Sequence, residues 1–447
     1  MSSNTIHIER VCVVNSMYSL LQYFLLSTEE EIKHTYYFWG EAISDPVSRY
    51  FERQSVDIFR LMDTAWKEKK ISSPYMEEYF YHEFFPTKWP FLLRDDITYF
   101  GHDHLPCSPY VLREHSFELL EDGMLNYHKY PFSAKDDYVS LFKNREGKYG
   151  PLNILQVDYA GQEEQCRVIH LTGISKTDYI TPGKVSYSSL EKMWNTADEG
   201  KKDLINTIYA FQKDQFNYLD KKRILLTQPL SEDSLMSEKE KMRLFSRITD
   251  YIGRDNLVIK KHPRDVSNYE CCNVESININ IPLQLLSLNG IRFSEAITIS
   301  STAVFDFNYP ILVTYLGAQI SPLLLKKFPN ASLDKVQFSN SNIRLSDTSY
   351  DKLALEMHQE YIESLTKRIE ELSSNVTSLS NSVRSLTSDN QALEREIASQ
   401  EDVIASKTES LRHAERKANK NKKIFQTLIW VLIAWILTFI IVCGAVL

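Results

Sequence analysis

Residues 10–27, RVCVVNSMYSLLQYFLLS, contain the pattern that decides the fold of this chain. The first part is a short apolar run, which predicts a buried strand, and the second part has the length and composition of a helix. Similar pairs recur up to about residue 345. Strands that alternate with helices in this way are typical of a parallel sheet with crossover helices.

The alternation occurs in two series, separated by the polar, helix-rich segment 188–222. The sequence therefore predicts an α/β protein with two Rossmann-like lobes, residues 1–215 and 216–345. Ligands of such sheets bind beyond the carboxyl ends of strands, so we searched there for site residues. The predicted strands lie in RVCVVNS (10–16), HTYYFWG (34–40), DITYFGH (96–102), FELLEDG (117–123), RVIHLTG (167–173), RILLTQPL (223–230), NLVIKKHP (256–263), AITISSTAVFDF (296–307, leading into a helix) and PILVTYLG (310–317).

The composition limits the possible functions. With 447 residues, of which 43% are hydrophobic, the chain can form more than one core. Its formal net charge of −8 argues against a general nucleic-acid binder, which needs a basic face. The six cysteines include no CxxC pair, which indicates free thiols in a reducing compartment rather than a zinc site or a disulfide framework.

A heptad repeat begins at Ile362. Its a positions are mostly β-branched and its d positions are leucine, which favours a parallel two-stranded coiled coil, and Asn390 at an a position fixes the register. We expect residues 346–411 to form a stalk that makes the chain a homodimer; a single amphipathic helix packed on the body is the alternative. The a positions are Ile362, Ile369, Val376, Val383, Asn390, Ile397, Ile404 and Leu411, and the d positions are Leu365, Leu372, Leu379, Leu386 and Leu393, fading to Gln400 and Lys407.

Residues 424–447, IFQTLIWVLIAWILTFIIVCGAVL, carry no charge. As a helix they would span roughly 36 Å, enough to cross a hydrocarbon core of about 30 Å. The juxtamembrane segment 412–423 is rich in arginine and lysine, which stay on the cytoplasmic side, and the N-terminus has no secretory signal. We therefore expect a single-pass, transmembrane tail anchor with the body in the cytoplasm; a buried core helix is the alternative.

Three predicted strand ends carry residues suited to catalysis or ligand binding. One combines two carboxylates with a glycine, one joins a histidine to a proline, and one is rich in hydroxyls. Each group alone has an ordinary interpretation, as a turn, a rigid loop or a helix cap. The groups are Glu121-Asp122-Gly123 in the first lobe, and His262-Pro263 and Ser300-Ser301-Thr302 in the second.

In this order, and on opposite lobes, these groups resemble the motifs of bacterial sialyltransferases and polysialyltransferases, including glycosyltransferase family 52. Those families have an acidic-acidic-glycine motif in the first lobe, and a His-Pro motif followed by a serine-rich motif in the second. The loop TQPLSED, residues 227–233, is also similar. The resemblance covers roughly residues 8–320 and does not include the stalk or the anchor.

The resemblance implies a GT-B fold with an acceptor lobe and a nucleotide-sugar lobe, which uses CMP-sialic acid as donor and needs no metal or other cofactor. Asp122 would take the proton of the acceptor hydroxyl. His262, protonated or as a hydrogen-bond donor, would stabilise the phosphate of the departing CMP. The predicted substrate- and nucleotide-binding residues are Glu121, Gly123, Gln228, Pro263, Ser300, Ser301 and Thr302.

Two alternatives concern the site. Glu121, or Glu232 and Asp233 in the TQPLSED loop, could supply the base instead of Asp122. GHDH, residues 101–104, could be a metal site, but two histidines without a third ligand argue against it.

The predicted function is an inverting sialyltransferase that acts on a lipid-linked or capsular glycan precursor at the cytoplasmic face of the bacterial inner membrane. Its partners would be the nucleotide-sugar donor, the glycan acceptor, the membrane and a second copy of the chain, without nucleic acid. Another CMP-linked ulosonic acid as donor is a close variant. The alternative from a different class is a non-catalytic, membrane-tethered coiled-coil scaffold with a degenerate transferase body.

Overall fold

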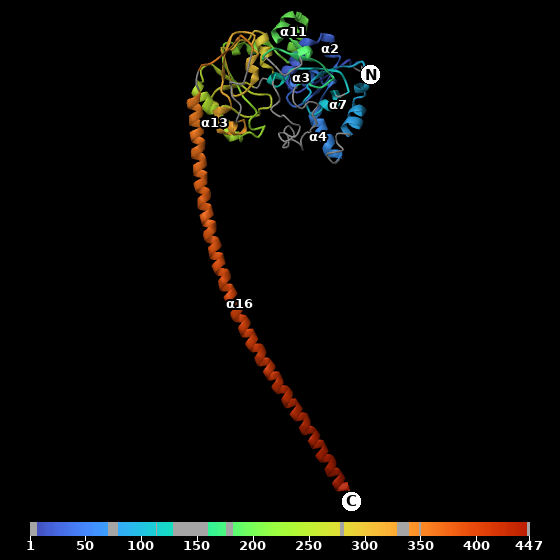
Figure 1. Cartoon of the computed structure of the whole chain (residues 1–447), viewed down its shortest axis with the longest axis vertical. Coiled ribbons are helices and arrows are strands. Elements are labelled where there is room, and N and C mark those ends of the chain that lie inside the picture. Colours follow the sequence, from blue (N-terminus) through green and yellow to red (C-terminus); the bar gives the residue numbers. More distant parts are fainter. Residues whose placement is uncertain are drawn as a thin grey trace. The chain divides into compact units, whose positions relative to one another are not determined.

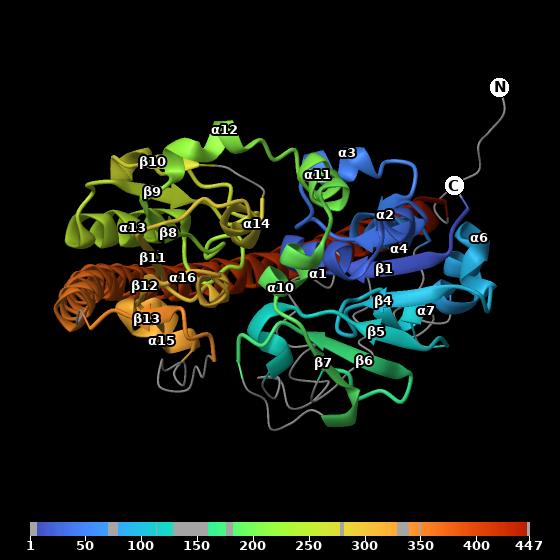
Figure 2. The same ribbon diagram turned by 90° about the horizontal axis from the view of Figure 1, so that it is seen from above.

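The first compact unit of the protein, Met1–Glu360, holds two parallel sheets, and the second, Tyr361–Leu447, continues one long helix. We describe the protein from a computed structural model. The structure describes residues 7–69, 79–112, 114–127, 160–175, 182–277, 281–328, 339–347 and 350–444. Figures 1 and 2 show the sheets of the first unit and the helices around them.

Within the described residues, the N-terminal lobe has a seven-stranded parallel sheet in the order β3-β2-β1-β4-β5-β6-β7. The order reverses between β1 and β4, which makes the carboxyl ends of these strands a switch point where ligands bind. The strands are β1 (Arg10–Val14), β2 (Thr35–Trp39), β3 (Ser55–Asp57), β4 (Thr98–Gly101), β5 (Phe117–Leu119), β6 (Cys166–Leu171) and β7 (Val185–Tyr187).

The helices described in this lobe are α1 (Met17–Leu26), α2 (Glu29–Lys33), α3 (Asp45–Tyr50), α4 (Ile58–Lys69), the π-helix η1 (Phe80–Phe84), α6 (Phe85–Lys88), η2 (Pro90–Leu93), α7 (Ser108–Leu112), η3 (Gly123–Tyr127) and η5 (Pro182–Lys184). The connection to the second lobe is helical: α10 (Leu190–Thr196), α11 (Glu199–Ile208), α12 (Lys213–Phe216) and η6 (Asn217–Leu219).

The described part of the C-terminal lobe has a six-stranded parallel sheet in the order β10-β9-β8-β11-β12-β13. Its order reverses between β8 and β11, so it repeats the switch point of the first lobe. The strands are β8 (Arg223–Leu226), β9 (Leu257–Lys260), β10 (Glu275–Ile277), β11 (Glu295–Thr298), β12 (Ile311–Tyr315) and β13 (Ile343–Leu345), and the helices are α13 (Glu238–Ile252), η7 (Glu270–Cys272), α14 (Leu283–Leu288), η8 (Thr302–Phe305), η9 (Ala318–Ile320) and α15 (Pro322–Lys327).

The predicted α/β fold with two Rossmann-like lobes is confirmed, and each predicted strand overlaps one of the observed strands. The short strands β3, β7, β10 and β13 were not predicted. Local signals explain the boundaries of the helices. Ser16 caps α1 by accepting the N–H of Ser19. Ser237 and Glu240 form a capping box at the start of α13, which ends at Gly253 with a φ of 79°. The helix expected after the serine-rich motif is a short 3₁₀ helix, η8.

One apolar core contains buried side chains from both lobes. It joins Leu20 of α1, Trp194 of α10 and Leu286 of α14, and it continues into strands of both sheets. The hydroxyl of Tyr209 donates a hydrogen bond of 3.0 Å to the carbonyl of Met17. The two lobes are therefore packed together as one unit, although each has its own sheet.

The long helix α16 runs from Asp351 to Gly444. Its first turns belong to the body, where Leu353 is buried. Beyond Glu360, the a and d leucines, isoleucines and valines of the heptads are exposed in the single chain. The parallel coiled-coil dimer stays a prediction.

Within the described part of the chain, we find no helix that combines the length and the apolar character needed to cross a bilayer. The tail-anchor prediction therefore has no support from the structure. The side chains of residues 439–447, which belong to the predicted anchor 424–447, lie outside the description.

Candidate active site

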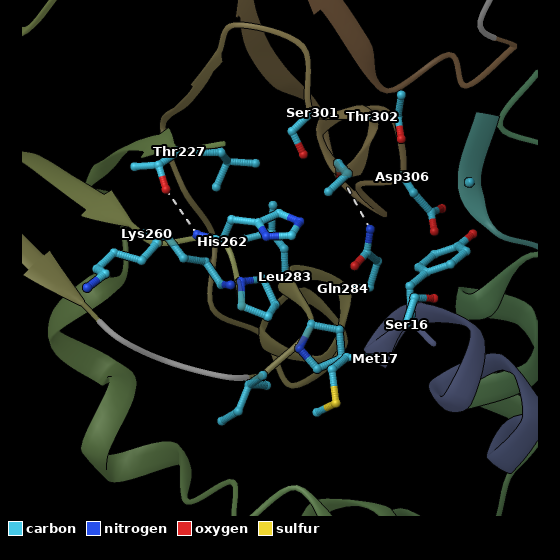
Figure 3. A pocket seen from close by; sticks show the side chains of 18 of the residues that line it. Ser16, Met17, Thr227, Lys260, His262, Leu283, Gln284, Ser301, Thr302 and Asp306 are labelled. Carbon is cyan, nitrogen blue, oxygen red and sulfur yellow. Dashed lines mark hydrogen bonds between the residues drawn. The ribbon is translucent and has the colours of Figure 1, made fainter. Parts of the chain in front are cut away.

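A cavity of about 230 Å³ lies between the switch points of the two lobes. Its walls come from the carboxyl ends of β1 and β5 in the first lobe and of β8, β9 and β11 in the second. This is the position where sheets of this type bind ligands. The polar residues around it include Asp122. Others, labelled in Figure 3, are Ser16, Thr227, His262, Gln284, Ser301, Thr302 and Asp306.

Asp122 lies shortly beyond the carboxyl end of β5 and lines the cavity. Its Oδ2 lies 3.1 Å from Nε2 of His104, and its backbone N–H donates to Asn126 Oδ1. Burial raises the pKa of Asp122, but His102 and His104 beside it outweigh burial and hold this pKa well below its usual range. The carboxylate is therefore ionised at neutral pH and can accept a proton.

His104 is buried between two carboxylates. Asp103 Oδ1 lies 3.5 Å from its Nδ1, and Asp122 Oδ2 lies 3.1 Å from its Nε2. Burial lowers the pKa of His104, but the two carboxylates more than compensate and raise it to about 9. Burial lowers the pKa of the neighbouring His102 to about 4. At neutral pH, His104 therefore carries the positive charge beside Asp122, and His102 is neutral.

The ligand atoms of His102, His104 and Asp122 lie within 4.8 Å of one another, which is close enough for a shared metal ion. The prediction that the two histidines of GHDH lack a third ligand is wrong, because the fold brings Asp122 beside them. The hydrogen bond between His104 and Asp122, and the contact of 2.9 Å between His102 Nε2 and Ser19 Oγ, account for the same groups without a metal. Metal independence stays a prediction.

Glu121 is fully buried and is not among the described residues that line the cavity. Its carboxylate accepts hydrogen bonds from Tyr18 Oη at 2.9 Å and Tyr127 Oη at 2.8 Å, and from the backbone and hydroxyl of Thr172. Burial raises its pKa to about 7. Glu121 thus ties the end of β5 to α1 and to the end of β6, which is a structural position rather than that of a base.

His262 follows β9 and lines the cavity from the second lobe, where its imidazole lies near Ser301 and Leu283 (Figure 3). The backbone N–H of Arg264 donates to its Nδ1 at 3.1 Å, so the proton of the neutral ring sits on Nε2. Burial, Arg264 and Lys260 lower the pKa of His262 to about 4. Of the two roles that the sequence left open, this geometry favours the neutral hydrogen-bond donor.

Buried ion pairs hold the loop that carries His262. Lys241 has no exposed side-chain surface, and its Nζ lies 2.7 Å from Asp265 Oδ1 and 3.0 Å from Glu232 Oε2. Asp265 also accepts hydrogen bonds from Thr227 and Tyr269. These contacts are the physical basis of a fixed His-Pro loop, because each charge in them would be costly without its partner.

The TQPLSED loop takes part in the same group of ion pairs. Glu232 accepts from Lys241 and from the backbone of Val266, and Asp233 forms two hydrogen bonds with Arg264, of 2.6 and 3.0 Å. Neither carboxylate is among the described residues that line the cavity. The structure therefore favours Asp122 over the loop as the base.

The remaining predicted residues divide into two groups. Pro263, Ser301 and Thr302 line the cavity, and Gly123 does so with a φ of +61°, where an added Cβ would lie 3.1 Å from Thr302 Oγ1 of the other lobe. Gly123 therefore allows the lobes to approach each other closely. Gln228 and Ser300, although described, are not among the lining residues.

Sequence reasoning missed several residues of the cavity. Ser16 follows β1, and the strand-end rule would have found it if it had been applied to residues 10–16, whereas Tyr18 lies in the first turn of α1. Asp306 and Gln284 come from elements whose sequences carry no comparable signal. In Figure 3, Ser16, Thr302 and Asp306 lie on one side of the cavity, and Lys260 turns its amine away from the centre. Burial lowers the pKa of Lys260 to about 8.

Two Rossmann-like lobes that meet at one cavity between their switch points define the GT-B architecture. A sequence profile of glycosyltransferase family 52 matches residues 61–313, which is more than half of the chain. The chain therefore belongs to glycosyltransferase family 52. It is 32% identical over 250 residues to an uncharacterised protein of Haemophilus influenzae, a match that covers 55% of this chain and 76% of that protein.

Solved structures with a similar fold include an α/β-galactoside α-2,3-sialyltransferase from Photobacterium phosphoreum, with a TM-score of 0.40 and 11% identity, over 76% of this chain and 99% of that chain. Another is a 2,6-sialyltransferase of Photobacterium sp. JT-ISH-224, solved with CMP and lactose, with a TM-score of 0.40 and 13% identity, over 75% of this chain and 78% of that chain. Likenesses this distant carry no argument about function.

Proposed function

We propose that this protein transfers sialic acid from CMP-sialic acid to a glycan hydroxyl, with inversion and without a metal. The observation that carries the proposal is that Asp122 of the first lobe and His262 of the second line the same cavity. Transfer from a nucleotide donor needs a base for the acceptor and a hydrogen-bond donor for the leaving group. The ionised carboxylate and the imidazole N–H have these properties.

In the proposed reaction, the bond between the anomeric carbon of sialic acid and the CMP phosphate oxygen breaks, and a bond to the acceptor oxygen forms. Asp122 takes the proton of the acceptor hydroxyl. The electron pair of the broken bond stays on the phosphate, where the Nε2–H of His262 donates a hydrogen bond. The hydroxyls of Ser301 and Thr302, which line the same cavity, would donate to the phosphate as well.

The acceptor in this proposal is a lipid-linked or capsular glycan precursor at the cytoplasmic face of the bacterial inner membrane. The basic segment 412–423 before an uncharged C-terminus supports membrane attachment, and the heptads support a parallel homodimer. Another CMP-linked ulosonic acid as donor is the close variant. The exposed apolar heptad residues favour a second candidate, a non-catalytic scaffold with a degenerate transferase body.

The test is CMP release from CMP-sialic acid by the full-length protein, with a panel of galactosyl and sialyl acceptors. Asp122→Asn and His262→Asn are each expected to reduce turnover by about 100-fold or more. Asp45→Asn and His34→Asn, at more exposed positions outside the cavity, serve as matched controls and are expected to behave as wild type. A folded wild type that neither binds nor turns over the donor would exclude the transferase and favour the scaffold.

A further inference from the structure

A second cavity, of about 260 Å³, adjoins the first. The two cavities share the lining residues Ile174, Gln284 and Asp306, so they are direct neighbours with a common wall. The other walls of the second cavity come from the beginning of α10, from α14, from the residues after η8 and from the segment 339–342.

Hydroxyl, amide and carboxylate groups dominate the walls of this second cavity. Its described lining residues include no lysine, arginine or histidine, whereas Lys261 and the hydrogen-bond donor His262 line the first cavity. The second cavity therefore lacks the charge to bind a phosphate or a carboxylate, but it is suited to hydroxyl groups. The polar residues are Thr172, Ser189, Glu191, Gln284, Ser287, Asp306, Asn308, Ser339, Asn340, Ser341 and Asn342.

Two carboxyl groups line this cavity. Asp306 Oδ2 is buried and has no hydrogen-bond partner among the residues that the structure describes. Burial, and then the nearby Glu121, raise the pKa of Asp306 well above its usual range, which favours the neutral acid, a group that can both donate and accept a hydrogen bond. Glu191, in the first turn of α10, is exposed, lines only the second cavity of the two and offers further acceptors to the hydroxyls of a sugar.

Internal hydrogen bonds fix the walls between these carboxyl groups. Asn340 Nδ2 donates to the carbonyls of Phe305 and Phe307 at 3.0 and 2.9 Å. The backbone N–H of Ser339, from the second lobe, donates to the carbonyl of Ile174 in the first at 2.9 Å, and its hydroxyl donates to the carbonyl of Gly173. The cavity is therefore preformed where the lobes meet.

We propose that the second cavity is an acceptor subsite for a neutral, hydroxyl-rich sugar, one residue back from the sugar that receives sialic acid. This inference rests on the proposed function and deepens it by naming the acceptor class. A sugar with a carboxylate at this position is disfavoured, because it would meet Glu191 without a lysine, arginine or histidine among the described lining residues to offset the repulsion.

The probes are methyl β-galactoside, lactose, and lactobionate, in which a carboxylate replaces the reducing end of lactose. With wild-type full-length protein, the KM of lactose is expected to be about tenfold lower than that of methyl β-galactoside, because two to three additional hydrogen bonds form. Lactobionate is expected to lose this advantage. In Glu191→Gln and Asp306→Asn, the preference for lactose over methyl β-galactoside decreases, because each variant changes a hydrogen-bonding group of the cavity. In Glu191→Gln, the discrimination against lactobionate also weakens.

Glu199→Gln, a carboxylate on the exposed surface of α11, is the matched control and is expected to keep both ratios of the wild type. Equal KM values for lactose and methyl β-galactoside in the wild type, or unchanged ratios in both variants, overturn the subsite. CMP release without transfer to any galactoside also overturns it. These outcomes leave the transferase in place, whereas the absence of any CMP release overturns the proposed function itself.

Discussion

Replacing His104 by glutamine tests whether His104 carries a positive charge beside Asp122, and the test does not depend on any activity. The two carboxylates raise the folded-state pKa of His104 from 6.5 to about 9. A group whose pKa is raised on folding stabilises the protein fully below its unfolded pKa, and this contribution is lost as the pH rises through the folded pKa. The difference between 6.5 and about 9, at about 1.4 kcal/mol per pH unit, corresponds to roughly 3 kcal/mol of the free energy of unfolding. This contribution is lost between about pH 6.5 and 9.

The assay is the melting temperature of the full-length protein at pH 6.5 and at pH 9.5. At roughly 1–2 °C per kcal/mol for a unit of this size, the wild type should lose about 3–6 °C more than the His104→Gln variant over this interval. Glutamine can keep a hydrogen bond to Asp122, but it has no charge to lose. The difference between the two proteins therefore isolates the titration of His104.

His102→Gln is the matched control, because burial lowers the pKa of His102 to about 4 and this side chain is neutral throughout the interval. Its variant should keep the pH dependence of the wild type. If His104→Gln and the wild type lose equal stability between pH 6.5 and 9.5, the assignment of the charge to His104 is refuted, and with it the contribution of His104 to the low pKa of Asp122.

Three further predictions concern the metal, the leaving-group side and the loop. Incubation with EDTA should leave CMP release unchanged; a loss that added Mg²⁺ or Mn²⁺ restores would contradict metal independence. The pKa of His262 is lowered to about 4, so below that pH the ring gains a proton, and the pH profile of kcat/KM should show no His262 limb near 6.5; a limb there that disappears in His262→Gln would contradict the neutral donor. Lys241→Met leaves the carboxylates of Glu232 and Asp265 without their cation and should destabilise the protein by about 3–5 kcal/mol. An unchanged melting temperature would show that these ion pairs do not stabilise the fold.

The predicted strands could be found because their local signal agrees with their environment. The strands that were not predicted, β3, β7, β10 and β13, have three residues each. Residues 11–14 are a continuous apolar run, and all four are buried, as expected for the central strand of a parallel sheet with both faces covered. The positions of Asp122 and His262 followed from the same reasoning, because both lie directly beyond such strands. The 3₁₀ form of η8 was not predictable, since the sequence TAVF does not distinguish it from a helical turn.

The environments of neighbouring polar residues could not be predicted. Glu121 and Asp122 are adjacent in the sequence. Glu121 is fully buried and hydrogen-bonded, whereas Asp122 lines the cavity. The side chains that decide this, Tyr18 and Thr172, are about 50 to 100 residues away in the chain. The contact between His104 and Asp122 is likewise formed only by the packing of β4 beside β5.

The apolar core that both lobes share determines how this protein can be divided. A fragment that ends between the lobes would expose Leu20 and Trp194 on one piece and Leu286 on the other, and each piece would lose part of its interior. Recombining the N-terminal lobe of one relative with the C-terminal lobe of another would therefore require matched side chains across this boundary. In such a chimaera, one lobe can be exchanged only together with the side chains of the shared apolar core that contact it.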